Sequence, residues 1–370
     1  MSALGLYIDL PFCIQRCSYC AFAVRGYREG EASRYLAALL QEARMAAHTL
    51  AGPRIETVYL GGGTPTHYPV DALARLLEVL RECYVIADGA EVSVEAHPET
   101  LDLPALSRLK RLGVNRLSLG VQSLHAEDLR AMGRRYAPER VERVLGEARA
   151  AGFDNIAVDL IYGLPGQSFS GWASVLRSAI ALEPEHLSVY GLSIEPGTLW
   201  GKKDAEGALS LPGEEEEIRM FSLAEALLKE NGYEHYEISN YAKPGCRCRH
   251  NLLYWKGGDY LGVGLAAHSS ISGKRWSNTE DLWDYLRFIE GGTLPVTFEE
   301  TLTQDQRLAD KVIFGLRRIE GVRWTPSHER LMGKRLTRLI QTGLLLKEGG
   351  VVRLTDRGIL LADEVAIRLI

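Results

Sequence analysis

The 370-residue sequence contains no run of about 18 uncharged apolar residues, which a membrane-spanning helix would need. Its first residues, MSALGLYIDLPF, have neither the basic segment nor the small-residue cleavage site of a secretory signal. We therefore expect a cytoplasmic protein without an integral membrane segment. Transient association with a membrane surface stays open.

The sequence also has little net charge and few cysteines. Its 43 Lys and Arg residues against 48 Asp and Glu residues leave a formal charge of −5, and no long basic block is present. A surface that binds nucleic acid is therefore not expected. Six cysteines in 370 residues are too few for a disulfide framework. Closely spaced cysteines in a reducing compartment instead indicate metal or redox chemistry.

Short apolar runs of strand type alternate with segments of helical periodicity in the first 210 residues. Six such β-then-α units predict an α/β fold, with a parallel sheet curled into a partial or full barrel. Polar and Gly-rich motifs follow the expected strands, at the rim where such barrels carry their chemistry. The expected strands are residues 5–10, 55–60, 91–96, 115–121, 155–163 and 186–194.

We expect three regions along the chain: a barrel over residues 1–210, an extension of it over 211–298, and a small winged-helix-like domain over 299–370. In the last region a Gly-Gly hairpin at 349–350 joins two short strands before a final helix. Its basic residues are scattered, which favours a structural cap on the barrel over a DNA-binding role.

Three cysteines, Cys13, Cys17 and Cys20, fall within the stretch FCIQRCSYCAF directly after the first expected strand. Three thiolates at this spacing suit a four-iron cubane cluster better than structural zinc, which usually takes four protein ligands. Three thiolates also leave one iron open to a small chelating molecule. The alternatives to a cluster are a zinc site and three cysteines that are buried in an ordinary hydrophobic core.

The stretch CIQRCSYC resembles the signature of the radical S-adenosylmethionine superfamily, whose partial (β/α)6 barrel matches the expected strands. The resemblance implies a [4Fe-4S] cluster whose open iron binds the methionyl amine and carboxylate of S-adenosylmethionine. Further motifs, LYIDLPFC, GGGTPT, GVQSL, VDLIYGLPGQ and HNLLYW, are similar to the branch that contains oxygen-independent coproporphyrinogen III oxidases. The similarity extends over essentially the whole chain.

The resemblance also implies which residues hold S-adenosylmethionine. Taken alone, GGGTP is more typical of an ordinary turn, and a single carboxylate such as Asp159 or Glu95 is equally typical of a helix cap or an ion pair. Their shared position at strand ends favours the functional interpretation. The residues are Tyr7 and Phe22 beside the cofactor, Gly62, Gly63, Thr64 and Glu95 at the methionyl amine, Arg134 at the carboxylate, and Gln122 and Asp159 at the ribose.

Two departures separate this sequence from the porphyrinogen-oxidising members of the branch. Those members carry another cysteine where this chain has Phe22, and they carry a segment before the first strand that helps to hold the tetrapyrrole. In both features this sequence resembles the sister group of HemW-type haem chaperones, which carry haem to acceptor proteins. This comparison predicts a chaperone rather than an oxidase.

The motif RHNLLYW, residues 249–255, resembles the haem-binding motif of that group and places an imidazole at His250 beside two aromatic rings. From the residues alone, a histidine in an aromatic core is the alternative. Just upstream, Cys246 and Cys248 depart from the expected pattern. Three interpretations of this pair stay open: free thiols, a second metal site together with His250, or a thiolate ligand to haem.

The sequence therefore predicts a haem chaperone with a [4Fe-4S] cluster and S-adenosylmethionine. Its partners would be haem and acceptor haem proteins, such as respiratory ones. One alternative is a coproporphyrinogen III oxidase that abstracts hydrogen from propionate side chains. Another is a radical enzyme acting on an unrelated substrate, with HNLLYW purely structural. Whether the chain also cleaves its cofactor as an enzyme stays open.

Overall fold

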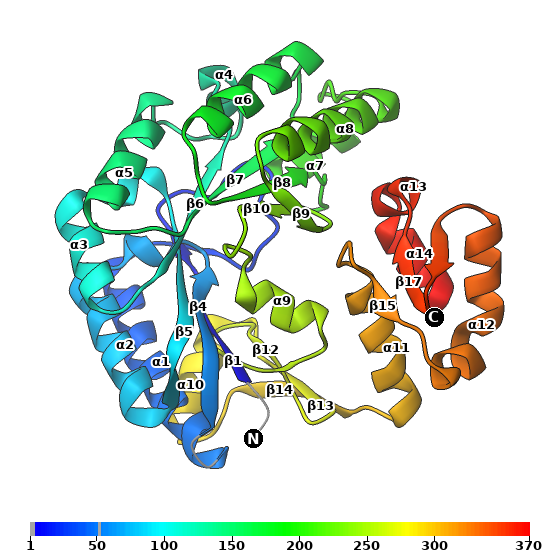
Figure 1. The fold of residues 1–370 in the computed structure, drawn as a ribbon. Coiled ribbons are helices and arrows are strands. Elements are labelled where there is room, and N and C mark those ends of the chain that lie inside the picture. Colours follow the sequence, from blue (N-terminus) through cyan, green and yellow to red (C-terminus); the bar gives the residue numbers. More distant parts are fainter. Residues whose placement is uncertain (1–3, 51–52) are drawn as a thin grey trace.

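The computed structural model describes residues 4–50 and 53–370, and its centre is a curled sheet of parallel strands (Figure 1). Helices between successive strands cover the outer, convex face of this sheet. The six expected strands are present as β1 (Leu4–Leu10), β4 (Arg54–Gly62), β5 (Val85–Ala96), β6 (Arg116–Gln122), β7 (Ile156–Tyr162) and β8 (His186–Gly191). The covering helices are α1 (Glu29–Thr49), α2 (Val70–Cys83), α3 (Leu103–Arg111), α5 (Glu139–Ala150) and α6 (Phe169–Ala181).

The alternation of side chains along β1 shows how the sequence produces the two faces of the sheet. Successive side chains of a strand point to opposite faces. Leu6 and Ile8 are fully buried under the helices, whereas Tyr7 and Asp9 point to the concave face and remain partly exposed. The apolar set of β1 thus anchors the strand, and the intervening polar residues are presented to the interior of the barrel.

The sheet extends beyond the six expected strands at both edges. Next to β1 lies a seventh parallel strand, β11 (Asp259–Val263), followed by the antiparallel strands β12 (His268–Ile271), β13 (Lys274–Asn278) and β14 (Val296–Thr301). At the other edge β8 pairs with β10 (Asn240–Ala242), which pairs with β9 (Glu234–Glu237). Within the described residues β14 and β9 each have one neighbour, so the barrel is partial and open, as expected.

Several smaller elements connect the strands and border the concave side. A two-stranded pair, β2 (Phe12–Cys13) and β3 (Arg25–Gly26), brackets the loop that carries Cys17 and Cys20. The remaining helices of this part are α4 (Ala126–Ala131), α7 (Leu199–Ala205), α8 (Glu214–Glu230), α9 (Arg249–Trp255) and α10 (Leu282–Glu290).

The C-terminal residues form a separate small module with its own hydrophobic core. It lies beside α9, where Trp255 packs against Phe314 and under the guanidinium of Arg317 (Figure 1). A three-stranded sheet and four helices build it, in the arrangement expected of a winged-helix-like domain. These elements are α11 (Gln304–Gly315), β15 (Val322–Arg323), α12 (Pro326–Gln341), β16 (Leu345–Glu348), β17 (Val351–Leu354), α13 (Asp356–Leu360) and α14 (Ala362–Leu369).

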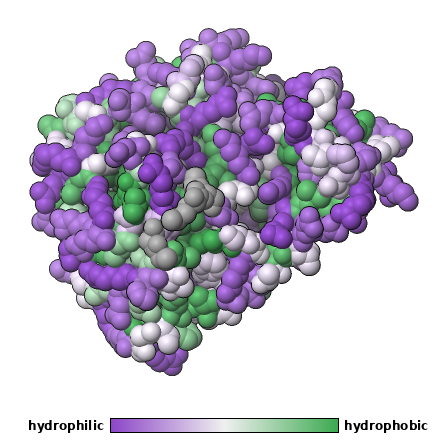
Figure 2. All heavy atoms as spheres, turned by 60° about the horizontal axis from the view of Figure 1, so that its bottom comes forward, coloured by the Kyte–Doolittle hydropathy of each residue, from purple (hydrophilic) through white to green (hydrophobic). Residues whose placement is uncertain are grey.

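The surface turned forward in Figure 2 is largely hydrophilic, and its hydrophobic side chains stand in small groups separated by polar ones. None of the helices described is both long enough and apolar enough to cross a lipid bilayer. Buried apolar residues form two cores, one between sheet and helices and one in the C-terminal module.

Candidate functional site

The three cysteines of the opening motif lie on one loop at the rim of the barrel. Cys13 ends β2, and its Sγ lies 3.4 Å from Thr64 Oγ1, at the end of β4. Burial raises the pKa of Cys13 to about 11, and the proximity of Cys20 and Cys17 raises it further, against the hydrogen bond with Thr64. The three thiols therefore lie close enough to influence one another electrostatically.

The arrangement of these thiols suits a cluster rather than a single ion. Among the residues that the structure describes, no three His, Cys, Asp or Glu side chains converge on one point that could hold a metal ion. A cubane cluster does not require such convergence, because each thiolate binds a different iron at a corner of the cluster. Three thiols on one rim loop fit a four-iron cluster, with each thiolate bound to one iron.

The loop is held in place by contacts with distant parts of the chain. Ser18 N donates to Met132 O at 3.1 Å, and Trp200 N donates to Ser18 O at 2.9 Å. On its other side Gly63 packs so closely that a Cβ atom there would lie 2.7 Å from the carbonyl carbon of Pro11. The GGGTPT motif therefore needs a glycine at this position to approach the cysteine loop.

Three carboxyl groups point into the barrel from alternate strands of the sheet: Asp9 on β1, Glu95 on β5 and Asp159 on β7. Burial raises the pKa of Asp9 to about 8 and that of Glu95 to about 7, and it also raises the pKa of Asp159. Tyr7 donates to Asp9 Oδ2 at 3.3 Å, and Tyr59 donates to Glu95 Oε1 at 2.8 Å. A cluster of partly desolvated carboxyls favours a cationic ligand.

Gln122 and Arg134 meet at the end of β6. Gln122 has a positive φ of 70°, a conformation that costs energy for a residue with a side chain and often marks a functional position. The Arg134 side chain is nearly buried and donates through Nη1 to the carbonyl of Gly120 and, at 3.3 Å, to the hydroxyl of Tyr136. Its Nε has no hydrogen-bond partner among the described residues. A buried guanidinium with an unused donor fits an anionic group such as a carboxylate.

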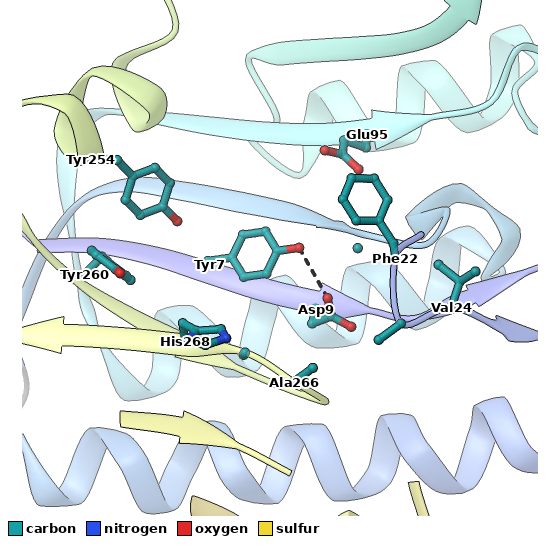
Figure 3. A pocket seen from close by; sticks show the side chains of 12 residues that line it. Tyr7, Asp9, Phe22, Val24, Glu95, Tyr254, Tyr260, Ala266 and His268 are labelled. Atoms are coloured by element: carbon teal, nitrogen blue, oxygen red, sulfur yellow. Dashed lines mark hydrogen bonds between the residues drawn. The ribbon is translucent and has the colours of Figure 1, made fainter. Parts of the chain in front are cut away.

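A cavity of about 380 Å³ opens between the cysteine loop and the concave face of the sheet (Figure 3). One end is bordered by carboxyl groups and by the cysteine loop, where Phe22 is exposed beside Glu95. The other end is bordered by aromatic rings and one imidazole. The lining residues are Tyr7, Asp9, Phe22, Ala23, Val24, Gly62, Glu95, Tyr254, Tyr260, Ala266, Ala267 and His268.

The structure places His250 behind the wall of this cavity rather than in it. His250 is 1% exposed, its Nδ1 lies 2.8 Å from Thr57 Oγ1, and its Nε2 lies 2.9 Å from the Tyr254 hydroxyl. Burial lowers the pKa of His250 to about 3, with the charge of Arg116 acting in the same direction. The imidazole is therefore neutral, and in this conformation neither nitrogen is free to bind iron.

The other residues of the HNLLYW motif and the preceding cysteines divide between different environments. Tyr254 lines the cavity, but Trp255 packs on the C-terminal module, so the two rings do not flank one ligand. Cys248 is fully buried, and its Sγ donates to Glu91 Oε1 at 3.7 Å. Burial raises the pKa of Cys248 to about 12, which keeps the thiol protonated. Cys246 is only partly buried, and burial raises its pKa as well.

Comparison with known proteins identifies the same class of protein that the three rim cysteines and the open barrel indicate, the radical SAM superfamily. Residues 7–179 match the model of the radical SAM superfamily. The chain is 36% identical, over 99% of its length and 94% of the relative, to the heme chaperone HemW of Mycobacterium tuberculosis H37Rv, and 34% identical, over 97% of both, to that of Bacillus subtilis. The structure of the Escherichia coli coproporphyrinogen III oxidase HemN, a radical SAM enzyme, superposes with a TM-score of 0.87 and 27% identity over 100% of this chain and 90% of that one.

The chain therefore belongs to the radical SAM superfamily, as its opening motif indicated. Within that superfamily it belongs to the family of the heme chaperone HemW. Membership of the superfamily implies a [4Fe-4S] cluster and S-adenosylmethionine.

Asp9 and His268 are among the cavity residues that were not included in the site expected from the sequence. Asp9 lies within the LYIDLPFC motif, and its place on the same face of β1 as Tyr7 was a signal for it, because strand residues two apart share a face. His268 follows the Gly-rich turn GVGLAA, and a structural role was as good an interpretation of the sequence. Only the folded chain shows that its side chain is exposed at the cavity.

Proposed function

We propose that this chain is a haem chaperone, which binds haem and passes it to acceptor haem proteins while holding a [4Fe-4S] cluster and S-adenosylmethionine. The observation that carries this proposal is the identity of 36% over 99% of the chain to a protein named as a heme chaperone. The cavity beside the cysteine loop supports it, because aromatic rings suit a flat macrocycle.

Cys13, Cys17 and Cys20 would bind three irons of the cluster, and the fourth iron would be left to S-adenosylmethionine. The carboxyl groups at this end of the cavity support a ligand that carries an ammonium and a sulfonium charge. We assign the methionyl amine to Glu95 and to the loop of Gly62, Gly63 and Thr64, the methionyl carboxylate to Arg134, and the ribose to Gln122 and Asp159, with Tyr7 and Phe22 beside the cofactor.

When bound, the cluster and S-adenosylmethionine supply an electron and a cleavable carbon–sulfur bond. The chain itself provides the positions and the charge for them. Burial raises the pKa of Asp9 to about 8 and that of Glu95 to about 7, so both carboxyls are partly protonated at neutral pH, and a bound cation would favour their ionised form. Tyr7 and Tyr59 fix the two carboxyls by hydrogen bonds, which keeps them directed into the barrel.

His250 stays the haem ligand proposed from the HNLLYW motif. To reach iron it would have to exchange its hydrogen bond with Thr57 or Tyr254 for a coordination bond. Cys248 is a weaker candidate because its thiol is buried and protonated. Free haem and an acceptor haem protein would be the partners, and the cytoplasm the place of action. We also retain 1–210, 211–298 and 299–370 as the proposed division into regions.

The second candidate is an oxidase of coproporphyrinogen III, and the observation in its favour is the close superposition on HemN. Phe22 argues against it, because its apolar ring occupies the position beside the cluster loop where the oxidases carry a further cysteine. Phe22 is 72% exposed and borders the cavity, so a substrate entering there would meet this ring.

The proposal is tested by adding haemin to anaerobically reconstituted protein and removing the excess by gel filtration. We expect about one haem per chain, and its appearance in an added apo-haem protein with kinetics that depend on the concentration of the loaded chain. A protein that retains no haem above the level of an unrelated control protein would refute the chaperone function.

A further inference from the structure

The loop of the three cysteines is anchored to distant parts of the chain at its start and in its middle, but not at its end. Tyr27 N donates to Cys13 O at 2.8 Å, and Ser18 N donates to Met132 O at 3.1 Å. Residues 20–23, which include the last of the three cysteines, have no such anchor. Within the described chain their hydrogen bonds run to near neighbours in the sequence and to one side chain, that of Arg16.

The side chain of Arg16 folds back over the turn that separates the second and third cysteines. Its Nε donates to Cys20 O at 3.1 Å, and its Nη2 donates to Phe22 O at 3.4 Å. The turn itself is closed by Cys20 N, which donates to Cys17 O at 3.2 Å. A guanidinium presents its donors in a rigid fork, so that one side chain can hold two carbonyl groups at once. The position of the third cysteine therefore depends on Arg16.

Arg16 also brings a positive charge to the thiol of Cys20. Burial raises the pKa of Cys20, and both the charge of Arg16 and a hydrogen bond from it act in the opposite direction. A hydrogen bond from a cation favours the thiolate, which is the form that binds iron. No Asp or Glu among the described residues forms an ion pair with Arg16, so its charge is not compensated within that part of the chain.

Arg134 is the other cation whose charge favours a thiolate of this loop, that of Cys13. Its guanidinium is the group assigned above to the methionyl carboxylate of S-adenosylmethionine. An anion bound to Arg134 would cancel much of its field at the cysteines. With the cofactor in place, Arg16 would remain as the uncompensated cation beside them.

A fixed cation beside a cluster has a predictable effect on its reduction. A low-potential one-electron reductant adds one electron, and thus one negative charge, to the cluster. Hydrogen bonds and positive charge near the cluster sulfurs stabilise that added charge and raise the reduction potential. Arg16 is exposed, so water and salt screen part of its charge, but its two hydrogen bonds keep the guanidinium at the loop.

We propose that Arg16 is a positioning residue of the cluster, which holds Cys20 in place for its iron and raises the reduction potential of the cluster through its charge. This inference rests on the proposed cluster ligands. It adds to them a role for a residue that lies between two of the ligands in the sequence and binds no iron itself.

The test uses the anaerobically reconstituted full chain with Arg16→Met and Arg16→Lys, and with Arg28→Met as the matched control, because Arg28 is exposed and paired with Glu31. Reductive titration followed by the paramagnetic spectrum measures the potential, and a chelator measures the rate of iron loss. We expect Arg16→Met to have a lower potential and to lose iron about tenfold faster. Arg16→Lys should nearly keep the potential but still lose iron faster, since an ammonium lacks the fork. Arg28→Met should change neither.

Salt separates the effect of charge from a change of structure. The difference in potential between Arg16→Met and the unaltered chain should shrink as salt rises from about 10 mM to about 1 M, because the Debye length falls from about 30 Å to about 3 Å. A structural effect alone would give the same difference at both concentrations. If Arg16→Met retains too little cluster for a titration, the neutral Arg16→Gln, which can still donate to one carbonyl, takes its place.

Equal potentials of the unaltered chain and the neutral variant, or a difference that does not respond to salt, would overturn the role of the charge. Equal rates of iron loss in all variants would overturn the positioning role. Both results would leave the three cysteines standing as ligands. An unaltered chain that binds no cluster would refute the cluster of the proposed function, and this inference with it.

Discussion

His250 Nε2 and the Tyr254 hydroxyl lie 2.9 Å apart, one turn from each other on α9. This contact joins a buried imidazole to a ring that forms part of the cavity wall. The imidazole also stacks on Tyr59 with 5.1 Å between ring centroids, and the Tyr59 hydroxyl donates to Glu95. A continuous series of contacts therefore links the HNLLYW motif to the residues assigned to S-adenosylmethionine.

This geometry predicts that His250→Ala acts through stability and through the position of Tyr254. The substitution leaves the buried Thr57 hydroxyl without its partner, which costs about 2 kcal/mol of unfolding free energy. We expect a lower midpoint of thermal unfolding and weaker haem binding, measured by differential scanning calorimetry and haem titration. The bands of imidazole-bound haem should also change, because His250 is the proposed ligand of the iron. Tyr254→Phe, which removes only one hydroxyl, should reproduce a smaller part of both effects.

A second prediction concerns the cluster. Replacing Cys13, Cys17 and Cys20 together by Ala should abolish binding of about four irons and four sulfides per chain, because these thiolates are the proposed protein ligands. The same change should abolish the effect of S-adenosylmethionine on the paramagnetic spectrum of the reduced protein. Cys83→Ala, at the end of α2, is the control and should leave both measurements unchanged. Full iron content in the triple variant would contradict the assignment.

Arg134 and its neighbour Arg135 provide a matched pair for the cofactor site. Arg134 is nearly buried with a free Nε, whereas Arg135 is exposed. Arg134→Gln should weaken S-adenosylmethionine binding by about 1.5–3 kcal/mol, the range of a hydrogen bond to a charged group. Calorimetric titration of the reconstituted protein measures this loss. Equal affinities of the Arg134→Gln and Arg135→Gln variants would remove Arg134 from the site.

The buried carboxyl of Glu42 predicts a dependence of stability on pH. Burial raises its pKa from an ordinary 4.5 to about 7, against hydrogen bonds from Tyr285, Asn278 and Gly264. Between these two pH values the folded chain holds a proton that the unfolded chain has released. The contribution of Glu42 to stability therefore falls as pH rises through this window, by about 1.4 kcal/mol per pH unit. Outside the window it adds no slope.

Glu42→Gln isolates this contribution because the other buried carboxyls, Asp9 and Glu95, remain in both proteins. We expect the unaltered chain to lose about 2 kcal/mol of unfolding free energy relative to Glu42→Gln between pH 5.5 and pH 7. Chemical denaturation of the reconstituted proteins at several pH values measures the difference. Parallel pH profiles of the two proteins would show that Glu42 ionises as freely in the folded state as in the unfolded chain.

The parallel barrel was predictable because its signals are local. The apolar residues of β1 recur at every second position, and the Gly-rich motifs that follow β4 and β7 mark where strands end. The strand β11 was not predicted, since the Gly-rich stretch around Gly262 reads as a turn. Its place beside β1 depends on pairing between residues more than 250 positions apart, for which the sequence contains no periodic signal.

The candidate site was predictable to a similar extent. The spacing of Cys13, Cys17 and Cys20 and the resemblance of the surrounding motifs indicated the cluster and the cofactor end of the cavity. The surroundings of His250 were not predictable, because its partner Thr57 lies on a distant strand and its burial depends on how α9 packs there. The place of His268 at the cavity was not predictable for the same reason, because whether a histidine after a turn faces a cavity or a core depends on long-range packing.

The central claim, that this chain carries haem rather than oxidising porphyrinogens, is tested most directly by offering both substrates to the same reconstituted, anaerobic protein. With reductant and S-adenosylmethionine supplied, the account predicts about one tightly retained haem per chain and no conversion of coproporphyrinogen III to protoporphyrinogen IX, measured by absorption spectroscopy and chromatography. Multiple turnovers of coproporphyrinogen III by the unaltered chain, without retention of haem, would contradict it.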